Sequence, residues 1–147
     1  MVKTALASGA GAGILLGLFL KAAETLTGMK VYVLLLNIDF IPVLGDYRWS
    51  EASEFSFHLL FSLLLSFGLM LILEKGTGPT LPRCFIWSFA ITLPALLLYF
   101  PLSLLAVRQV PPPGDMMAFT VWTAGHLLYS TALAAFFWLG IRKTRLP

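Results

Sequence analysis

Charge is scarce in this sequence of 147 residues. Only 12% of the residues are charged, whereas 59% are hydrophobic, and a soluble domain carries about 25% charged residues. Because so few charges cannot cover a surface that faces water, the composition excludes an ordinary soluble enzyme. The apolar residues fall instead into long runs, which are typical of helices that span a membrane.

Cysteine and the usual signatures of catalysis are also scarce or missing. Cys84 is the only cysteine, which excludes an intramolecular disulfide and a cysteine-rich metal site, and we expect it to be a small packing residue. The sequence contains no phosphate-binding loop, no dinucleotide fingerprint and no nucleophile elbow. We therefore predict no catalytic residues, and an enzyme is the less favoured class of function.

Four apolar runs are each long enough to cross a bilayer as a helix. They cover about residues 4–26, 55–73, 84–107 and 116–141, and at about 1.5 Å per residue each can reach across a bilayer core of about 30 Å. Pro94 and Pro101 should kink the third helix. The fold class is therefore all-α, a single integral-membrane four-helix bundle over residues 1–147. A cleaved signal peptide at the first run is less favoured, because the small residues precede its apolar core.

The basic residues at the ends of the runs predict how the chain crosses the membrane. Four spans place both termini on one side, and six of the 10 basic residues lie there: Lys3, Lys75, Arg83, Arg142, Lys143 and Arg145. Because Lys and Arg favour cytoplasmic loops, we predict a multi-pass protein of the bacterial plasma membrane with both termini in the cytoplasm. Its partner is then the lipid bilayer, and the net charge of +3 does not indicate nucleic acid, because the basic residues flank apolar runs.

The longest connection, residues 27–54, is not a plain linker. Its apolar stretch, about residues 31–44, is interrupted by Asn37, Asp39 and Pro42 and is too short and interrupted for a fifth span. We expect an interfacial or re-entrant segment on the outer side. Acidic and aromatic residues around it leave open a site for a lipid headgroup or a cation.

Three glycines in the first run form a glycine zipper. Gly9, Gly13 and Gly17 recur every fourth residue, so they share one face of a helix and let another helix approach closely. Two partners fit this face, namely another helix of the same chain or a second copy in a homo-oligomer. The sequence leaves both open.

The second and fourth runs echo each other. Residues 58–62 read His-Leu-Leu-Phe-Ser, and residues 126–130 read His-Leu-Leu-Tyr-Ser. The histidine and the serine four positions later lie on one helix face, so each helix presents the same polar pair, His58 with Ser62 and His126 with Ser130. The echo suggests a two-plus-two internal repeat, in which the first pair of helices is related to the second.

Ionisable residues within the apolar runs suggest function, because they are costly inside a membrane. Lys21 and Glu24 are three residues apart and can pair with each other, or Glu24 can face inward to meet a histidine. Glu54 and His58 share a helix face, so we expect Glu24, Glu54, His58 and His126 to converge in the outer half of the bundle. Two uses stay open. His58 and His126 could hold a metal or a haem iron, or the cluster could bind and relay protons.

Several short motifs resemble the YagU-like family of bacterial inner-membrane proteins. They are Lys21-Ala22-Ala23-Glu24, His58-x-x-Phe61-Ser62, Phe100-Pro101-Leu102, Gly125-His126-Leu127 and a basic C-terminal tail. The resemblance covers the four spans but not residues 27–54, and Leu96 and Leu97 stand where a family member carries a histidine. It implies a membrane protein linked to acid resistance, without established enzymatic activity. The favoured prediction is thus a structural or stress-linked membrane protein, and the alternative is a metal-, haem- or proton-binding one.

Overall fold

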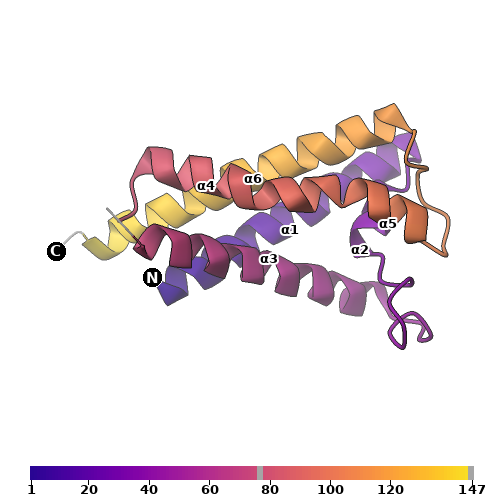
Figure 1. The fold of residues 1–147 in the computed structure, drawn as a ribbon, viewed down its shortest axis with the longest axis horizontal. Helices are drawn as coiled ribbons and strands as arrows, with labels where there is room; N and C mark the ends of the chain where they lie inside the picture. The colour runs from indigo at the N-terminus through magenta and orange to yellow at the C-terminus, as the bar shows by residue number, and fades with distance from the viewer. Residues whose placement is uncertain (76–77, 146–147) are drawn as a thin grey trace.

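In the computed structural model, long helices run up and down to form a bundle (Figure 1). The structure describes residues 1–75 and 78–145. The long helices are α1 (Val2–Thr27), α3 (Glu51–Glu74), α4 (Leu81–Leu97) continued by α5 (Tyr99–Leu105), and α6 (Met116–Arg145). The described residues hold four spans long and apolar enough to cross a membrane, which confirms the predicted four-helix membrane fold.

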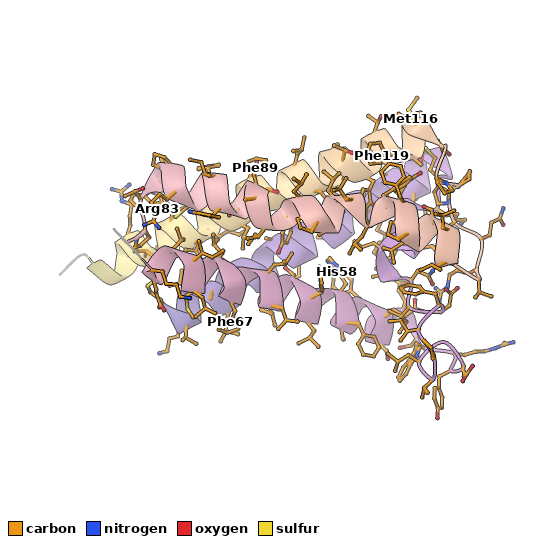
Figure 2. All side chains as sticks on the ribbon, in the orientation of Figure 1. His58, Phe67, Arg83, Phe89, Met116 and Phe119 are labelled. Atoms are coloured by element: carbon orange, nitrogen blue, oxygen red, sulfur yellow. The ribbon has the colours of Figure 1, made fainter. Side chains whose placement is uncertain are left out.

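The two ends of the bundle differ in charge. The start of α1, the end of α6, the end of α3 and the start of α4 lie at one end, here called the terminal end, and the other connections lie at the opposite, loop end (Figure 1). Figure 2 shows Arg83 at the terminal end and Met116 at the loop end. By the bounds of the helices, Glu74 of the seven acidic residues lies at the terminal end, and the loop end holds the others: Glu24, Asp39, Asp46, Glu51, Glu54 and Asp115. The bundle therefore has the charge asymmetry that the sequence predicts, while its direction across a membrane stays a prediction.

α1 is the central helix, because it packs along both α3 and α6, while α4 packs on α6 and less extensively on α3. Its Leu16 and Leu20 are buried against α6, where a Cβ at Gly125 would lie 3.0 Å from Leu16 and 3.1 Å from Leu20. Large apolar side chains also cover the outside of the bundle, as at Leu64 on α3, which is 60% exposed. Such a continuous apolar exterior is stable only where hydrocarbon replaces water.

A break separates α4 from α5 at Leu98. Pro101 has no amide hydrogen, and its ring clashes with the carbonyl four residues back, so the helix cannot continue unbroken past Leu97. The distortion that the prolines predict is found here. The Leu96 carbonyl beside the break accepts a hydrogen bond of 2.9 Å from Trp122 Nε1 on α6, which ties the break to the next helix.

Residues 31–44 do not form a fifth span. They begin with the short helix α2 (Val31–Leu36), which packs against α1, α3, α5 and α6 at the loop end. The carboxylate of Glu24 caps the N-terminus of α2, because its Oε2 accepts hydrogen bonds from the amides of Tyr32 at 2.9 Å and Val33 at 3.0 Å. The first amides of a helix lack partners within it and favour a negative charge. Glu24 therefore fixes α2 over the loop end of the bundle.

Candidate functional site

A ladder of hydrogen bonds joins α3 side chains to α1 carbonyls. Ser66 Oγ donates to Ala5 O at 2.8 Å, Ser62 Oγ to Gly9 O at 2.7 Å, and His58 Nε2 to Gly13 O at 3.0 Å. Donors and acceptors are each spaced by four residues, and they run in opposite directions because the helices are antiparallel. The ladder fixes the rotation of α3 and turns His58 and Ser62 toward the inside of the bundle.

The glycines of α1 make this approach close enough for hydrogen bonding. A Cβ at Gly9 would lie 2.8 Å from Ser66 Cβ, and one at Gly13 would lie 2.8 Å from Ser62 Oγ. A Cβ at Gly17 would clash with the Phe55 ring. Of the two partners that the glycine zipper predicts, the structure has the helix of the same chain. In this chain the face is therefore covered by α3, and self-association through it stays a prediction.

A cavity of about 230 Å³ lies between the helices on the loop-end side of this ladder. Its polar lining comes from α3 and α6: Glu54, His58, Ser62, Trp122, His126 and Tyr129. Apolar side chains of α1, α2, α4 and α5, such as Leu16, Leu36, Ala95 and Leu102, complete it. Figure 2 shows His58 on α3 within this part of the bundle. Of the residues predicted to converge, the cavity brings together Glu54, His58, Ser62 and His126.

The two histidines hold their hydrogens on different ring nitrogens. His126 is 3% exposed, and its Nδ1 lies 2.9 Å from the carbonyl of Trp122. Because a carbonyl only accepts, this nitrogen carries the hydrogen, and Nε2 is the acceptor of the neutral ring. In His58 the bond to Gly13 O places the hydrogen on Nε2, so that Nδ1 is the acceptor.

Tyr129 links α6 to the ladder. Its hydroxyl oxygen lies 3.0 Å from Ser62 Oγ and 3.4 Å from the Ser62 carbonyl oxygen. A carbonyl oxygen can only accept, so the Tyr129 hydroxyl is the donor in the contact with the Ser62 carbonyl. Tyr129 was not among the predicted site residues. The echo could have indicated it, because Tyr129 carries a hydroxyl where the matching residue of the second run is Phe61.

Ser130 is not part of the cavity lining, because it donates to the carbonyl of His126 within α6 at 2.8 Å. The echoed pairs thus bond differently: His58 and Ser62 reach to α1, whereas His126 and Ser130 bond to their own helix. The sequence echo does not extend to the hydrogen bonds. The two-plus-two relation of the helices stays a prediction.

Glu54 is held at the outer rim of the cavity by Arg108, a residue that the sequence did not single out. Arg108 binds the carboxylate through two nitrogens, Nη2 at 2.5 Å and Nη1 at 3.2 Å. Its Nε lies 3.5 Å from Asp39 Oδ2, and Asp39 accepts from the amides of Val107 and Arg108. Glu54 is only 6% exposed, so this charge is both buried and paired. No sequence spacing could indicate a partner 54 residues away.

The pKa of Asp39 lies below its usual value. Partial burial by itself would raise this pKa, but the backbone amides of Arg108 and Val107 outweigh the burial, and the charge of Arg108 adds to their effect. Asp39 therefore stays ionised while it ties the long connection to the end of α5.

Lys21 and Glu24 lie outside the cavity lining. Lys21 Nζ lies 2.5 Å from Glu51 Oε1, and Glu24 Oε1 lies 3.3 Å from Lys30 Nζ. The expected pair of Lys21 with Glu24 is therefore wrong, and Glu24 caps α2 instead of meeting a histidine. Tyr32 also donates to Glu51 at 3.0 Å, and burial together with this bond raises the pKa of Tyr32 to about 12.

The alternative of a metal or haem site gains no support from this geometry. Among the described residues, no group of three or more His, Cys, Asp or Glu side chains is placed to hold a metal ion. His58 and His126 share the cavity, but the carboxylate of Glu54 is taken up by Arg108. The site is therefore better described as a mainly apolar cavity with a polar end.

Comparisons with family models, with curated proteins and with solved structures found no match. The resemblance to the YagU-like family stays a prediction.

Proposed function

We propose that this protein is a non-enzymatic, multi-pass plasma-membrane protein that binds a small, mainly apolar molecule drawn from the bilayer. The cavity of about 230 Å³ carries the proposal. An apolar cavity of about 150 Å³ inside a protein is enough to bind benzene. The larger cavity here has room for a longer molecule, and pockets that bind small molecules are typically apolar with a few fixed polar groups.

The position of the cavity wall supports entry from the hydrocarbon. Phe61 on α3 and Leu98 at the α4–α5 break both line the cavity, and they are 44% and 38% exposed on the outside of the bundle. A side chain that borders both the cavity and the exterior marks the thinnest part of the wall. An apolar molecule in the bilayer would enter here, between α3 and the α4–α5 break.

The orientation in the membrane is part of the proposal. The basic terminal end favours the cytoplasm by the positive-inside rule, which would place the cavity in the outer half of the bilayer. The link to acid resistance that the YagU-like resemblance implies would then concern a protein that binds its ligand near the outer face.

Trp122 offers a direct test, because it lines the cavity and is only 1% exposed to the exterior. In a variant with Trp122 as its sole tryptophan (Trp49, Trp87 and Trp138→Phe), the protein is placed in lipid nanodiscs and titrated with 1-bromodecane. Bromine quenches tryptophan fluorescence only at short range. We expect saturable quenching at a low mole fraction of 1-bromodecane.

Filling the cavity supplies the control. Ala95 lines the cavity and is 7% exposed, so Ala95→Leu should occupy the space and abolish the saturable quenching. Ala124→Leu makes the same change at an exposed position of α6 and should leave it unaltered. Absence of saturable quenching in the parent, or equal quenching in Ala95→Leu, would overturn the proposal.

A further inference from the structure

At the polar end of the cavity, the hydrogen-bond donors of the lining side chains are already bonded within the protein. The donors of its lining side chains bond to protein oxygens: His58 Nε2 to Gly13, Ser62 to Gly9, Trp122 Nε1 to Leu96, His126 Nδ1 to Trp122, and Tyr129 to Ser62. Glu54 has no donor as a carboxylate. A ligand that needs a hydrogen-bond donor from the protein would find none here.

Acceptors, by contrast, are left over. In the neutral rings, His58 Nδ1 and His126 Nε2 each keep a lone pair, and no hydrogen bond from the described part of the chain reaches either nitrogen. His126 is 3% exposed, so outside solvent does not reach its ring freely. An acceptor that lacks a partner beside a mainly apolar cavity is unfavourable, and a ligand that donates a hydrogen bond would remove this cost.

We propose that the cavity binds a neutral lipid alcohol, whose hydroxyl group donates to His126 Nε2 and whose chain lies along Phe61, Leu65 and Leu98. This inference rests on the proposed function and names the ligand class of the same cavity. A carboxylate or phosphate head would need donors or a positive charge at this end. An ether, ester or ketone can only accept, and would leave the imidazole nitrogen unpaired.

A pair of ligands of equal size tests the head group on the unaltered cavity. 1-Decanol and 1-methoxynonane have the same number of carbon and oxygen atoms, but only the alcohol donates a hydrogen bond. Both compete with 1-bromodecane for the sole-Trp122 protein, with affinities expressed as mole fractions in the nanodisc. Because decanol can form one more hydrogen bond than the ether, we expect decanol to displace 1-bromodecane at a mole fraction roughly threefold to tenfold lower than the ether requires.

The outcomes separate the two proposals. If 1-bromodecane fails to quench Trp122, the proposed function fails. If quenching occurs but decanol is no better a competitor than the ether, the proposed function stands and the lipid-alcohol inference is overturned. Decanoate, which cannot donate when ionised, should compete no better than the ether, and preferential displacement by decanoate would also overturn the inference.

His126→Phe tests the acceptor itself. The variant keeps an aromatic ring but removes Nε2, so 1-bromodecane should still bind while the preference for decanol over the ether disappears. Ser130→Ala is the matched control, because Ser130 lies on the same helix face but outside the cavity lining, and it should keep the preference. A folded His126→Phe protein that still prefers decanol would contradict His126 Nε2 as the acceptor. If this variant does not fold, the comparison of decanol with the ether on the unaltered cavity tests the lipid-alcohol inference.

Discussion

Gly9→Ala is the most informative change in the α1–α3 interface. A methyl group at Gly9 would lie 2.8 Å from Ser66 Cβ, 3.1 Å from the Ser62 carbonyl oxygen and 3.2 Å from Leu63 Cα. Two of these contacts are with the backbone of α3, which cannot move aside alone. The helices must therefore separate, and separation weakens the hydrogen bonds that Ser62 and Ser66 make to α1.

The expected size follows from opposing terms. Replacing glycine by alanine in a helix favours folding by about 1 kcal/mol, whereas overpacking a close interface costs about 1–3 kcal/mol. Each weakened hydrogen bond removes up to about 1 kcal/mol. We expect Gly9→Ala to lower the free energy of unfolding by about 2 kcal/mol, the sum of these opposing terms. Gly68→Ala on α3 is the control, because its Cβ meets nothing within 4 Å, and it should leave the stability unchanged or slightly raised.

Cys84 provides the assay. It is the only cysteine in the sequence and is fully buried in the bundle, so a fluorescent maleimide reacts with it only after unfolding. Thermal unfolding followed by this reaction should show a lower midpoint for Gly9→Ala than for the parent or for Gly68→Ala. The mass of the protein in detergent is measured in parallel.

Two results would refute this reasoning. Equal stability of Gly9→Ala and the parent would mean that α1 and α3 do not approach as closely as the ladder requires. A variant that stays folded but loses a bound second copy would mean that the glycine face of α1 holds another chain instead of α3.

Two further predictions concern the ionic contacts at the loop end. Arg108→Gln leaves the buried Glu54 carboxylate without its guanidinium, and breaking a buried pair costs about 3–5 kcal/mol. Because the Arg108 side chain is 36% exposed, we expect the free energy of unfolding to fall by only about 2 kcal/mol. Cys84 labelling measures it, and the double variant with Glu54→Gln should recover part of the loss, whereas no recovery would argue against the pair. Asp39 has a lowered pKa, so its contribution to stability is present above its ordinary pKa of 3.8 and is lost as the pH falls through the lower, folded value. Asp39→Asn should therefore be less stable near neutral pH, and its stability should fall less than that of the parent on acidification below about pH 4. Parallel acid curves for the two proteins would contradict this.

The positions of the spans could be predicted closely. The first run, expected at residues 4–26, is α1 at Val2–Thr27, and the second, expected at 55–73, lies within α3 at Glu51–Glu74. The length of an apolar run and the charges at its ends suffice here, because a helix that crosses hydrocarbon must be both long and uncharged. The extra turn at the start of α3 escaped the prediction, because Glu51 and Glu54 are charged but favourable near a helix N-terminus.

The candidate site could be predicted only in part. Spacing by four residues correctly placed His58 with Ser62, and Glu54 with His58, on shared helix faces that reach the cavity. Glu24 does not take the inward position expected as one alternative, because the free amides of α2 bind its carboxylate. A helical pattern shows which residues share a face, but an apolar face suits lipid and another helix equally well.

Local sequence sets the number of spans, their ends, and the end of the bundle at which most acidic residues lie, since each of these depends on the local cost of placing charge in hydrocarbon. Tertiary structure alone decided the rotation of the helices about their axes. That rotation pairs Glu54 with Arg108, covers the glycine face of α1 with α3, and leaves one unpaired nitrogen on each histidine. These features depend on contacts between residues far apart in the chain, whose hydrogen bonds form only at one relative rotation and separation of the helices.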